Sequence, residues 1–279
     1  MAIDPEEYRR QSRETWGELA TPWTERREWF MEVTGPVNDR LVDRAAPEPG
    51  QTFLELAAGT GDLGFQVAER VGDGGRVLVT DFAPEMVEAA RRFGEGRSNV
   101  DYRVLDAEQM DLEDDSVDGV VCRWAYMLMS DPAGAFRETR RVLREGGPLS
   151  FAVWAGPDRN PWAAIPGMVL VQRGHMPPPE PGAPGIFAMG DPERIRELVT
   201  AGGFGEPDVE LLEFVFPSAD FETMWDNIAR MSPLARVLGE LPDDEQEAAR
   251  EAIREAVAPF RSEDGSYAAP AATWVALAR

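Results

Sequence analysis

Lysine is absent from this chain of 279 residues, so all 28 basic residues are arginines. This absence excludes a P-loop phosphate site, a Schiff-base enzyme and a dehydrogenase with a Tyr-x-x-x-Lys pair, because each needs a lysine amine. A single cysteine, Cys122, excludes an internal disulfide, and we expect a reducing, cytoplasmic location. With one cysteine and one histidine, we expect no metal site.

Long apolar runs are missing as well. No stretch of about 18 apolar residues is present, so we expect no membrane span. The first residues, MAIDPEEYRRQSRETW, lack the apolar segment of a signal peptide. The net charge of −23 would repel a phosphate backbone, so we expect no nucleic-acid partner. Hydrophobic residues, at 43%, suffice for one large α/β domain with a cap.

Strand-like and helix-like segments alternate through residues 49–155. We expect strands at 52–57, 76–80 and 100–105, then at 116–124 and before Trp154, with helices at 62–71, 84–93 and 132–143. This alternation predicts a doubly wound, mostly parallel α/β sheet. Residues 191–218 and 268–279 add a helix and two strands that complete the sheet.

The remaining segments are predicted to lie around this core. Residues 1–48 form an N-terminal helical cap segment, with breaks at Pro22 and at Gly35-Pro36. Residues 156–190 form a substrate-side insertion that includes HMPPPEPGAPG, a run too rich in proline for a regular element. Residues 219–267 form a helical cap insertion.

The stretch LELAAGTGDLG, residues 54–64, contains a Gly-x-Gly-x-x-Gly loop that suits either a dinucleotide or S-adenosylmethionine. Asp81, at the end of the second strand, could accept the ribose hydroxyls of both ligands. A dinucleotide would place its pyrophosphate at the helix N-terminus, where Asp62 stands. Asp62 and Glu55 therefore favour a ligand that carries an ammonium and a sulfonium. Asp106 could accept from an adenine amino group, while the backbone of Ala107 donates to a ring nitrogen.

Four ordered segments resemble the class I S-adenosylmethionine-dependent methyltransferases. They are FLELAAGTGDLG, VLVTDFAPEMVEAARR, YRVLDAEQMDLEDDSVDGVVCRW and AFRETRRVLREGGPLSFAVW. The form AAGTGD is similar to the ubiquinone/menaquinone-biosynthesis C-methyltransferase branch and related small-molecule methyltransferases. The resemblance implies a Rossmann-like methyltransferase fold with seven strands in the order 3-2-1-4-5-7-6, the last strand antiparallel. It also implies S-adenosylmethionine as cofactor and S-adenosylhomocysteine as product.

The resemblance assigns roles to the cofactor residues. Glu55 and the loop at Gly59 and Gly61 would surround the methionine part, and Asp81 would bind the ribose. Phe82 and Met86 would lie beside the adenine, whose edge Asp106 and Ala107 would read. Ala57, Thr60 and Arg123 complete the expected set. For Arg123 three partners remain open: the carboxylate of the cofactor, an acidic substrate, or an acid on the following helix.

Aromatic residues indicate where an acceptor would bind, because ligands of open α/β sheets lie at the carboxyl ends of the strands. We expect an apolar pocket under a mobile cap, lined by Trp16, Trp23, Trp124, Trp154 and Trp162. These side chains could instead only attach the cap to the core.

No general base can be assigned from the sequence. His175, Tyr126 and Asp131 are the candidates, although a transfer driven by alignment needs none. The expected function is in-line methyl transfer to a small apolar or aromatic metabolite, by a monomer or a homodimer. A nicotinamide-dependent oxidoreductase and a non-catalytic methyltransferase-like binding module are the alternatives.

Overall fold

A computed structural model describes residues 4–180 and 182–279; residues 1–3 of the N-terminal segment and residue 181 of the proline-rich insertion lie outside it. The strands are β1 (Thr52–Leu56), β2 (Arg76–Asp81), β3 (Val100–Val104), β4 (Gly119–Arg123), β5 (Leu149–Trp154), β6 (Asp208–Ser218) and β7 (Tyr267–Ala278). The helices are α1 (Pro5–Glu25), α2 (Arg27–Ala45), α3 (Asp62–Val71), α4 (Pro84–Phe93), α5 (Pro132–Val142), α6 (Pro161–Gln172), α7 (Pro192–Ala201), α8 (Phe221–Met231), α9 (Leu234–Gly239) and α10 (Asp243–Val257).

The strands form one sheet in the order β3-β2-β1-β4-β5-β7-β6. Strands β1 to β5 pair in parallel, and β7 is antiparallel to both β5 and β6. Every residue of β5 is buried, as expected for a central strand covered on both faces. The predicted fold class, strand order and antiparallel last strand are confirmed.

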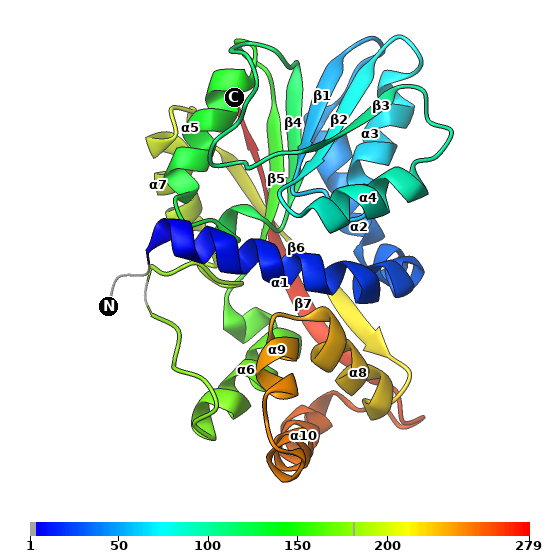
Figure 1. The fold of residues 1–279 in the computed structure, drawn as a ribbon, viewed down its shortest axis with the longest axis vertical. Helices are drawn as coiled ribbons and strands as arrows, with labels where there is room; N and C mark the ends of the chain where they lie inside the picture. The colour runs from blue at the N-terminus through cyan, green and yellow to red at the C-terminus, as the bar shows by residue number, and fades with distance from the viewer. Residues whose placement is uncertain (1–3, 181) are drawn as a thin grey trace.

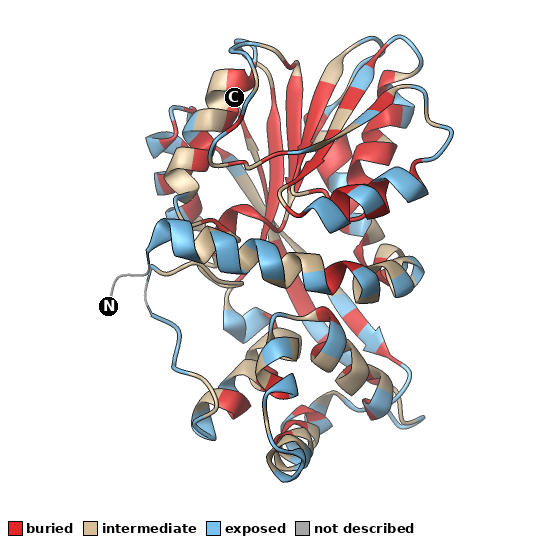
Figure 2. Ribbon diagram, in the orientation of Figure 1, coloured by how far each residue is buried: buried red, intermediate tan, exposed pale blue. Residues whose placement is uncertain are grey.

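Helices cover both faces of the sheet (Figures 1 and 2). Helices α2, α3 and α4 lie to its right in Figure 1, while α5 and α7 pack together to its left. Their buried faces join the strands in the main hydrophobic core. Helix α1 runs across the view between the sheet and the helices α6, α8, α9 and α10. It packs on α4 above and on α8 below, which places it over the carboxyl ends of the parallel strands.

The predicted breaks in the N-terminal segment are wrong. Pro22 lies inside α1 and Pro36 inside α2, and the two helices are separated at Arg26 instead. A proline inside a helix costs about 3 kcal/mol or more through a lost hydrogen bond and a clash with the preceding turn. Pro22 falls in the last turn of α1. The packing of α2, which buries residues such as Val37 and Leu41 completely, outweighs the cost of Pro36.

The insertion contains a helix that the sequence analysis missed. Helix α6 begins at Pro161, a favourable first position for proline, and ends before the proline-rich run. It packs against α10 in a second apolar cluster that also includes residues of α8 and α9. Strands β6 and β7, of 11 and 12 residues, extend beyond β5 into this cluster, where α8 packs on β6 and α6 on β7. We refer to α6, α8, α9 and α10 as the cap.

Candidate cofactor and acceptor site

Asp81 ends β2 and is fixed by backbone donors. Its Oδ2 accepts from the N–H of Gly59 at 3.0 Å and its Oδ1 from the N–H of Ala83 at 2.9 Å. Burial raises the pKa of Asp81 to about 6, although these N–H groups favour the ionised form. The carboxylate thus joins the glycine loop to the start of α4, at the position predicted for a ribose.

The glycine loop has one packed side and one open side. Gly61, with φ +83°, lies so close to α4 and α3 that a Cβ would meet the ring of Phe65 at 2.8 Å and Ala90 at 3.1 Å. Gly59, with φ +55°, faces space in which a Cβ would meet no atom within 4 Å. A ligand can therefore approach the backbone at Gly59 closely.

Glu55 is buried beneath this loop with an unused acceptor. The side chain lies in β1, and the residue is 2% exposed. Its Oε2 has no hydrogen-bond partner among the described residues. Burial raises its pKa well above the usual value, with Asp62 acting in the same direction and Arg123 opposing. A buried carboxyl oxygen without a protein partner fits a ligand that brings an ammonium group.

Asp62 begins α3 and is paired more fully than the sequence indicates. It accepts from the guanidinium of Arg27 and from Oγ1 of Thr60 at 2.5 Å. Arg27, which also lies over the ring of Phe93, comes from α2 and was not predicted as a site residue. Because Arg27 offsets the charge of Asp62, the acidic character of the loop depends mainly on Glu55 and Asp81.

The residues expected around the adenine lie next to α1. Met86 is buried in a cluster with Ala83 and with Leu19 of α1, and Phe82 packs against the same cluster. Arg13 of α1 lies 5.8 Å from the centre of the Phe82 ring.

The end of β3 lies beside Asp81, because the N–H of Leu105 donates to the Asp81 carbonyl at 2.9 Å. Asp106 follows, half-buried, and its Oδ1 accepts from the N–H of Glu108 at 2.9 Å. Ala107 is buried in this turn. The structure therefore brings the ends of β1, β2 and β3 together under α1.

Arg123 ends β4 and is held from α2. Its Nη1 donates to Oγ1 of Thr34 at 2.9 Å and to Oδ1 of Asn38 at 2.6 Å. The guanidinium lies 5.1 Å from the ring centres of both Phe30 and Trp124. Burial lowers its pKa, while Asp62 and Glu55 favour the charged form. Within the described chain it forms no ion pair with an acid of α5, one of the partners that the sequence left open.

A group of stacked aromatic side chains continues from Arg123. We call Trp124, Trp154, Trp162, Phe214 and Phe216 the aromatic wall. Trp124 and Trp154 stack with ring centres 4.0 Å apart at 14°, and Trp162 lies 4.9 Å from Trp154. Phe216 of β6 contacts Trp162 at 4.4 Å, and Phe214 lies 5.9 Å from Trp154.

Buried polar residues fix two rings of this wall. The indole N–H of Trp124 donates to Oγ1 of Thr273 at 2.9 Å, and Thr273 donates to the carbonyl of Val153 at 2.7 Å. The backbone of Trp124 has φ +58°, in the left-handed region. This conformation is costly for a bulky residue and persists only where the surrounding structure enforces it. The indole N–H of Trp162 donates to Oδ1 of buried Asn160 at 3.0 Å. Their ring edges are thus engaged by the framework.

The other predicted pocket residues join this wall through α1 and α2. Trp16 and Trp23 of α1 are 5.7 Å apart, Trp23 lies 4.6 Å from Phe30, and Phe30 lies 6.0 Å from Trp124. All five predicted tryptophans therefore belong to one continuous aromatic network, which connects α1, the strand ends and the cap.

The three candidate bases lie elsewhere. Tyr126 is completely buried, stacks on Phe136 and shares a hydrogen bond of 2.7 Å with Thr139 of α5; burial raises its pKa well above 10. His175 follows α6, and its Nε2 lies 3.4 Å from Glu245 of α10 inside the cap. The structure does not bring either side chain to the glycine loop.

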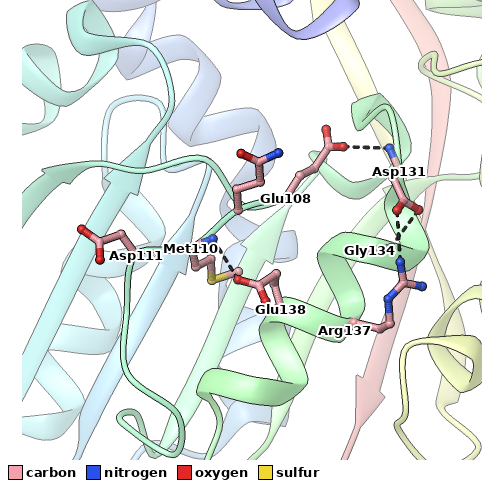
Figure 3. A pocket seen from close by; sticks show the side chains of 8 residues that line it. Glu108, Met110, Asp111, Asp131, Gly134, Arg137 and Glu138 are labelled. Carbon is pink, nitrogen blue, oxygen red and sulfur yellow. Dashed lines mark hydrogen bonds and ion pairs between the residues drawn. The ribbon is translucent and has the colours of Figure 1, made fainter. Parts of the chain in front are cut away.

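Asp131 caps α5, as its Oδ1 accepts from the N–H of Gly134 at 2.9 Å, and it pairs with Arg137 at 3.1 Å. It lines an open hollow of about 550 Å³ between α5 and the turn after β3 (Figure 3). The hollow is mostly polar. In its wall, Glu108 accepts from the backbone N–H of Asp131, and Glu138 accepts from the backbone N–H of Met110. This environment identifies Asp131 as a structural cap.

Residues 4–180 and 182–279 contain no group of three or more histidine, cysteine, aspartate or glutamate side chains suited to hold a metal ion. None of the helices described there combines the length and the apolar character needed to cross a bilayer.

Comparison with known proteins agrees with this geometry. Residues 54–151 match the family described as a methyltransferase domain. The ubiquinone/menaquinone biosynthesis C-methyltransferase of Vibrio parahaemolyticus is 29% identical over 184 residues, which cover 65% of this chain and 68% of the relative. The aklanonic acid methyltransferase of Streptomyces sp. strain C5 is 33% identical over 123 residues, 43% of this chain and 56% of the relative.

A crystal structure of a methyltransferase described as putative, from Bacillus halodurans, shares the fold. It has a TM-score of 0.59 and 22% identity, over 87% of this chain and 97% of that one. The chain spans 28 to 56% of the first curated relatives that it matches. Residues 54–151 thus match a methyltransferase domain, and the ordered motifs and the strand order are similar to those of the class I S-adenosylmethionine-dependent methyltransferases.

Proposed function

We propose that this protein transfers the methyl group of S-adenosylmethionine to a small apolar or aromatic metabolite by in-line displacement. The observation that carries the proposal is the pair of buried carboxyl groups around the glycine loop: Glu55 beneath it, and Asp81, which accepts from the N–H of Gly59. Such a pair suits a ligand that combines an ammonium with a ribose. When bound, S-adenosylmethionine supplies a methyl carbon already activated by the sulfonium.

The residues of the chain would then bind and orient the two reactants. We assign the cofactor to the predicted residues other than Arg123: Glu55, Ala57, Gly59, Thr60 and Gly61 at the methionine part, Asp81 at the ribose, and Phe82, Met86, Asp106 and Ala107 at the adenine. Alignment of bound reactants can supply roughly 7–11 kcal/mol of the barrier.

The aromatic network supports an apolar or aromatic acceptor: Trp16, Trp23 and Trp162 are half-buried, and Trp124 and Trp154 are buried behind them. The names of two relatives, which refer to quinone biosynthesis and to aklanonic acid, favour the same class. A small-molecule partner, a monomeric or homodimeric state and a cytoplasmic location, the last suggested by the single cysteine, belong to the same proposal.

Isothermal titration of the purified full-length chain with S-adenosylhomocysteine and with NADH tests the cofactor. We expect binding of S-adenosylhomocysteine that Glu55→Gln and Asp81→Asn weaken, while the exposed variant Arg40→Gln leaves it unchanged. Transfer of a labelled methyl group to a panel of aromatic metabolites then tests catalysis. Tight binding of NADH without binding of S-adenosylhomocysteine would favour an oxidoreductase. Binding without transfer to any member of the panel would favour a non-catalytic module.

A further inference from the structure

Arg123 leaves part of its hydrogen-bonding capacity unused at the strand ends. Only Nη1 donates, to Thr34 and Asn38, although a guanidinium offers five N–H groups. In the described part of the chain, Nε and Nη2 donate to no acceptor, and the residue is only half-buried. These two groups are the edge of a planar fork that matches an oxyanion.

The orientation of this fork is set by buried partners. Thr34 and Asn38 are both fully buried in α2, and the guanidinium lies against the rings of both Phe30 and Trp124. A long arginine side chain held in this way loses little additional conformational freedom when it binds an anion. The arrangement thus resembles a prepared binding group more than a surface charge.

The surroundings of Arg123 combine one positive charge with aromatic surface. The aromatic wall begins at Trp124, directly after Arg123, and continues through Trp154 to Trp162. The indole N–H groups of Trp124 and Trp162 are bonded to Thr273 and Asn160. Trp124 and Trp154 are buried, so the ring surface open to a ligand is that of the half-buried Trp162 and Phe214, which packs well against another planar ring.

We propose, building on the function proposed above, that Arg123 binds an oxyanion of the acceptor and that the acceptor is a planar aromatic anion lying against the aromatic wall. An aromatic carboxylate, a phenolate or an enolate conjugated to a ring has this chemistry. Asp62 and Glu55 lie near enough to favour the charged guanidinium, but neither accepts a hydrogen bond from Nε or Nη2. A neutral apolar acceptor would leave these two donors unpaired, which disfavours it.

An anionic acceptor also explains why a base is not needed near the strand ends. The guanidinium favours the ionised acceptor, so its proton is lost to water before transfer. The oxyanion, or the carbon conjugated to it, then forms the bond to the methyl carbon. The carbon–sulfur bond breaks with its electron pair left on sulfur. Charges balance, because one negative acceptor and one sulfonium give a neutral product at each centre.

The carboxylate of the cofactor is a second possible source of the anion, and the experiment must separate the two. The probes are naphthalene-2-carboxylate and the neutral naphthalene-2-carboxamide, titrated calorimetrically into the full-length protein with and without saturating S-adenosylhomocysteine. Affinity for S-adenosylhomocysteine is measured alongside. The variants are Arg123→Gln, Arg123→Lys, and Arg40→Gln as a surface arginine control, each checked for folding by circular dichroism.

We expect the wild type to prefer the carboxylate by at least about tenfold over the carboxamide, as a charged hydrogen bond would give. Arg123→Gln should abolish this preference and leave the affinities for the carboxamide and for S-adenosylhomocysteine within about twofold. Arg123→Lys keeps the positive charge but not the planar fork, so it should retain only part of the preference for the carboxylate. This variant serves as the test if Arg123→Gln does not fold. Arg40→Gln should behave as wild type.

Three results would overturn the inference. They are equal binding of the two probes by the wild type, an unchanged preference in the Arg123 variants, and a selective loss of S-adenosylhomocysteine affinity. The last would assign Arg123 to the cofactor carboxylate. Because the probes are also titrated alone, failure of the wild type to bind S-adenosylhomocysteine would refute the proposed function separately from the acceptor chemistry.

Discussion

Replacement of Thr273 by valine would test how the aromatic wall is held. Valine has nearly the shape of threonine, so the substitution Thr273→Val removes the hydroxyl without opening a cavity. The hydroxyl accepts from the indole N–H of Trp124 at 2.9 Å and donates to the Val153 carbonyl at 2.7 Å, at a position with no solvent exposure. The variant therefore leaves a buried indole donor without its acceptor.

The magnitude follows from that loss. A buried donor left unpaired costs about 1–3 kcal/mol of the free energy of unfolding. For a chain of this size, each kcal/mol lowers the melting temperature by about 2–4 °C, so we expect a decrease of about 2–12 °C. Trp124, at φ +58°, would also lose a contact that enforces its strained backbone.

Thermal denaturation followed by far-UV circular dichroism measures the stability, and near-UV circular dichroism reports the stacking of Trp124 on Trp154. Thr273→Ser is the matched control, because it keeps the hydroxyl and loses one methyl group, a cost of about 1 kcal/mol. We expect the near-UV signal to change in the valine variant only. The reasoning is refuted if Thr273→Val is as stable as wild type, or if Thr273→Ser reproduces both of its effects.

Further predictions concern the buried carboxyl groups and the net charge. The folded pKa of Asp81, about 6, lies above its ordinary value of 3.8, so ionisation of Asp81 costs stability as the pH rises through this interval. In urea denaturation, the free energy of unfolding of the wild type should therefore fall by about 3 kcal/mol between about pH 4 and about pH 7, and Asp81→Asn should remove this fall. A difference in stability between the variant and the wild type that does not vary with pH would contradict this. In Gly64→Ala, the added Cβ would lie 2.3 Å from Oε2 of Glu55, so titration should show S-adenosylhomocysteine binding weakened by about tenfold or more. Gly35→Ala, whose Cβ meets no atom within 4 Å, is its control, and equal losses in both would refute the steric explanation. Finally, the net charge of −23 predicts a melting temperature that rises from low salt to about 1 M NaCl, and an unchanged or falling value would show that self-repulsion does not limit stability.

The core could be predicted from the sequence because local and tertiary preferences agree there. Strand β2 ends at Asp81 as expected, and α4 occupies Pro84–Phe93, the predicted range. In the sequence, the buried strands appear as short runs of apolar residues, and an aspartate or a proline marks the start of each helix of the core. The same agreement placed Asp81, Asp106 and the glycine loop at one edge of the sheet.

The helices outside the core could be predicted less well, because packing there overrides local signals. Pro36 does not break α2, since the buried side of that helix is held by the sheet. Helix α6 combines apolar residues on all sides with an internal proline, Pro166, so no helical period marks it. Its stability comes from α10, which lies about eighty residues further along the chain.

The charged contacts of the site depend on the same long-range packing. Arg27 pairs with Asp62, and Arg123 with Asn38, only because α2 lies against the strand ends. No spacing in the sequence joins these residues. Tyr126 follows β4 directly, yet its ring turns away to the α5 side of the sheet. Position after a strand indicates nearness to the site but not the direction of the side chain.

The length of β6 and β7 has a mechanical consequence. These two strands are hydrogen-bonded to each other from Asp208 to Ser218, along both the main core and the cap. The cap is therefore attached by a stiff ribbon rather than by flexible linkers, and swinging it open as a rigid lid would require the ribbon to bend. Helix α1 crosses the strand ends and belongs to neither end of that ribbon, so its displacement would uncover the strand ends without bending the ribbon.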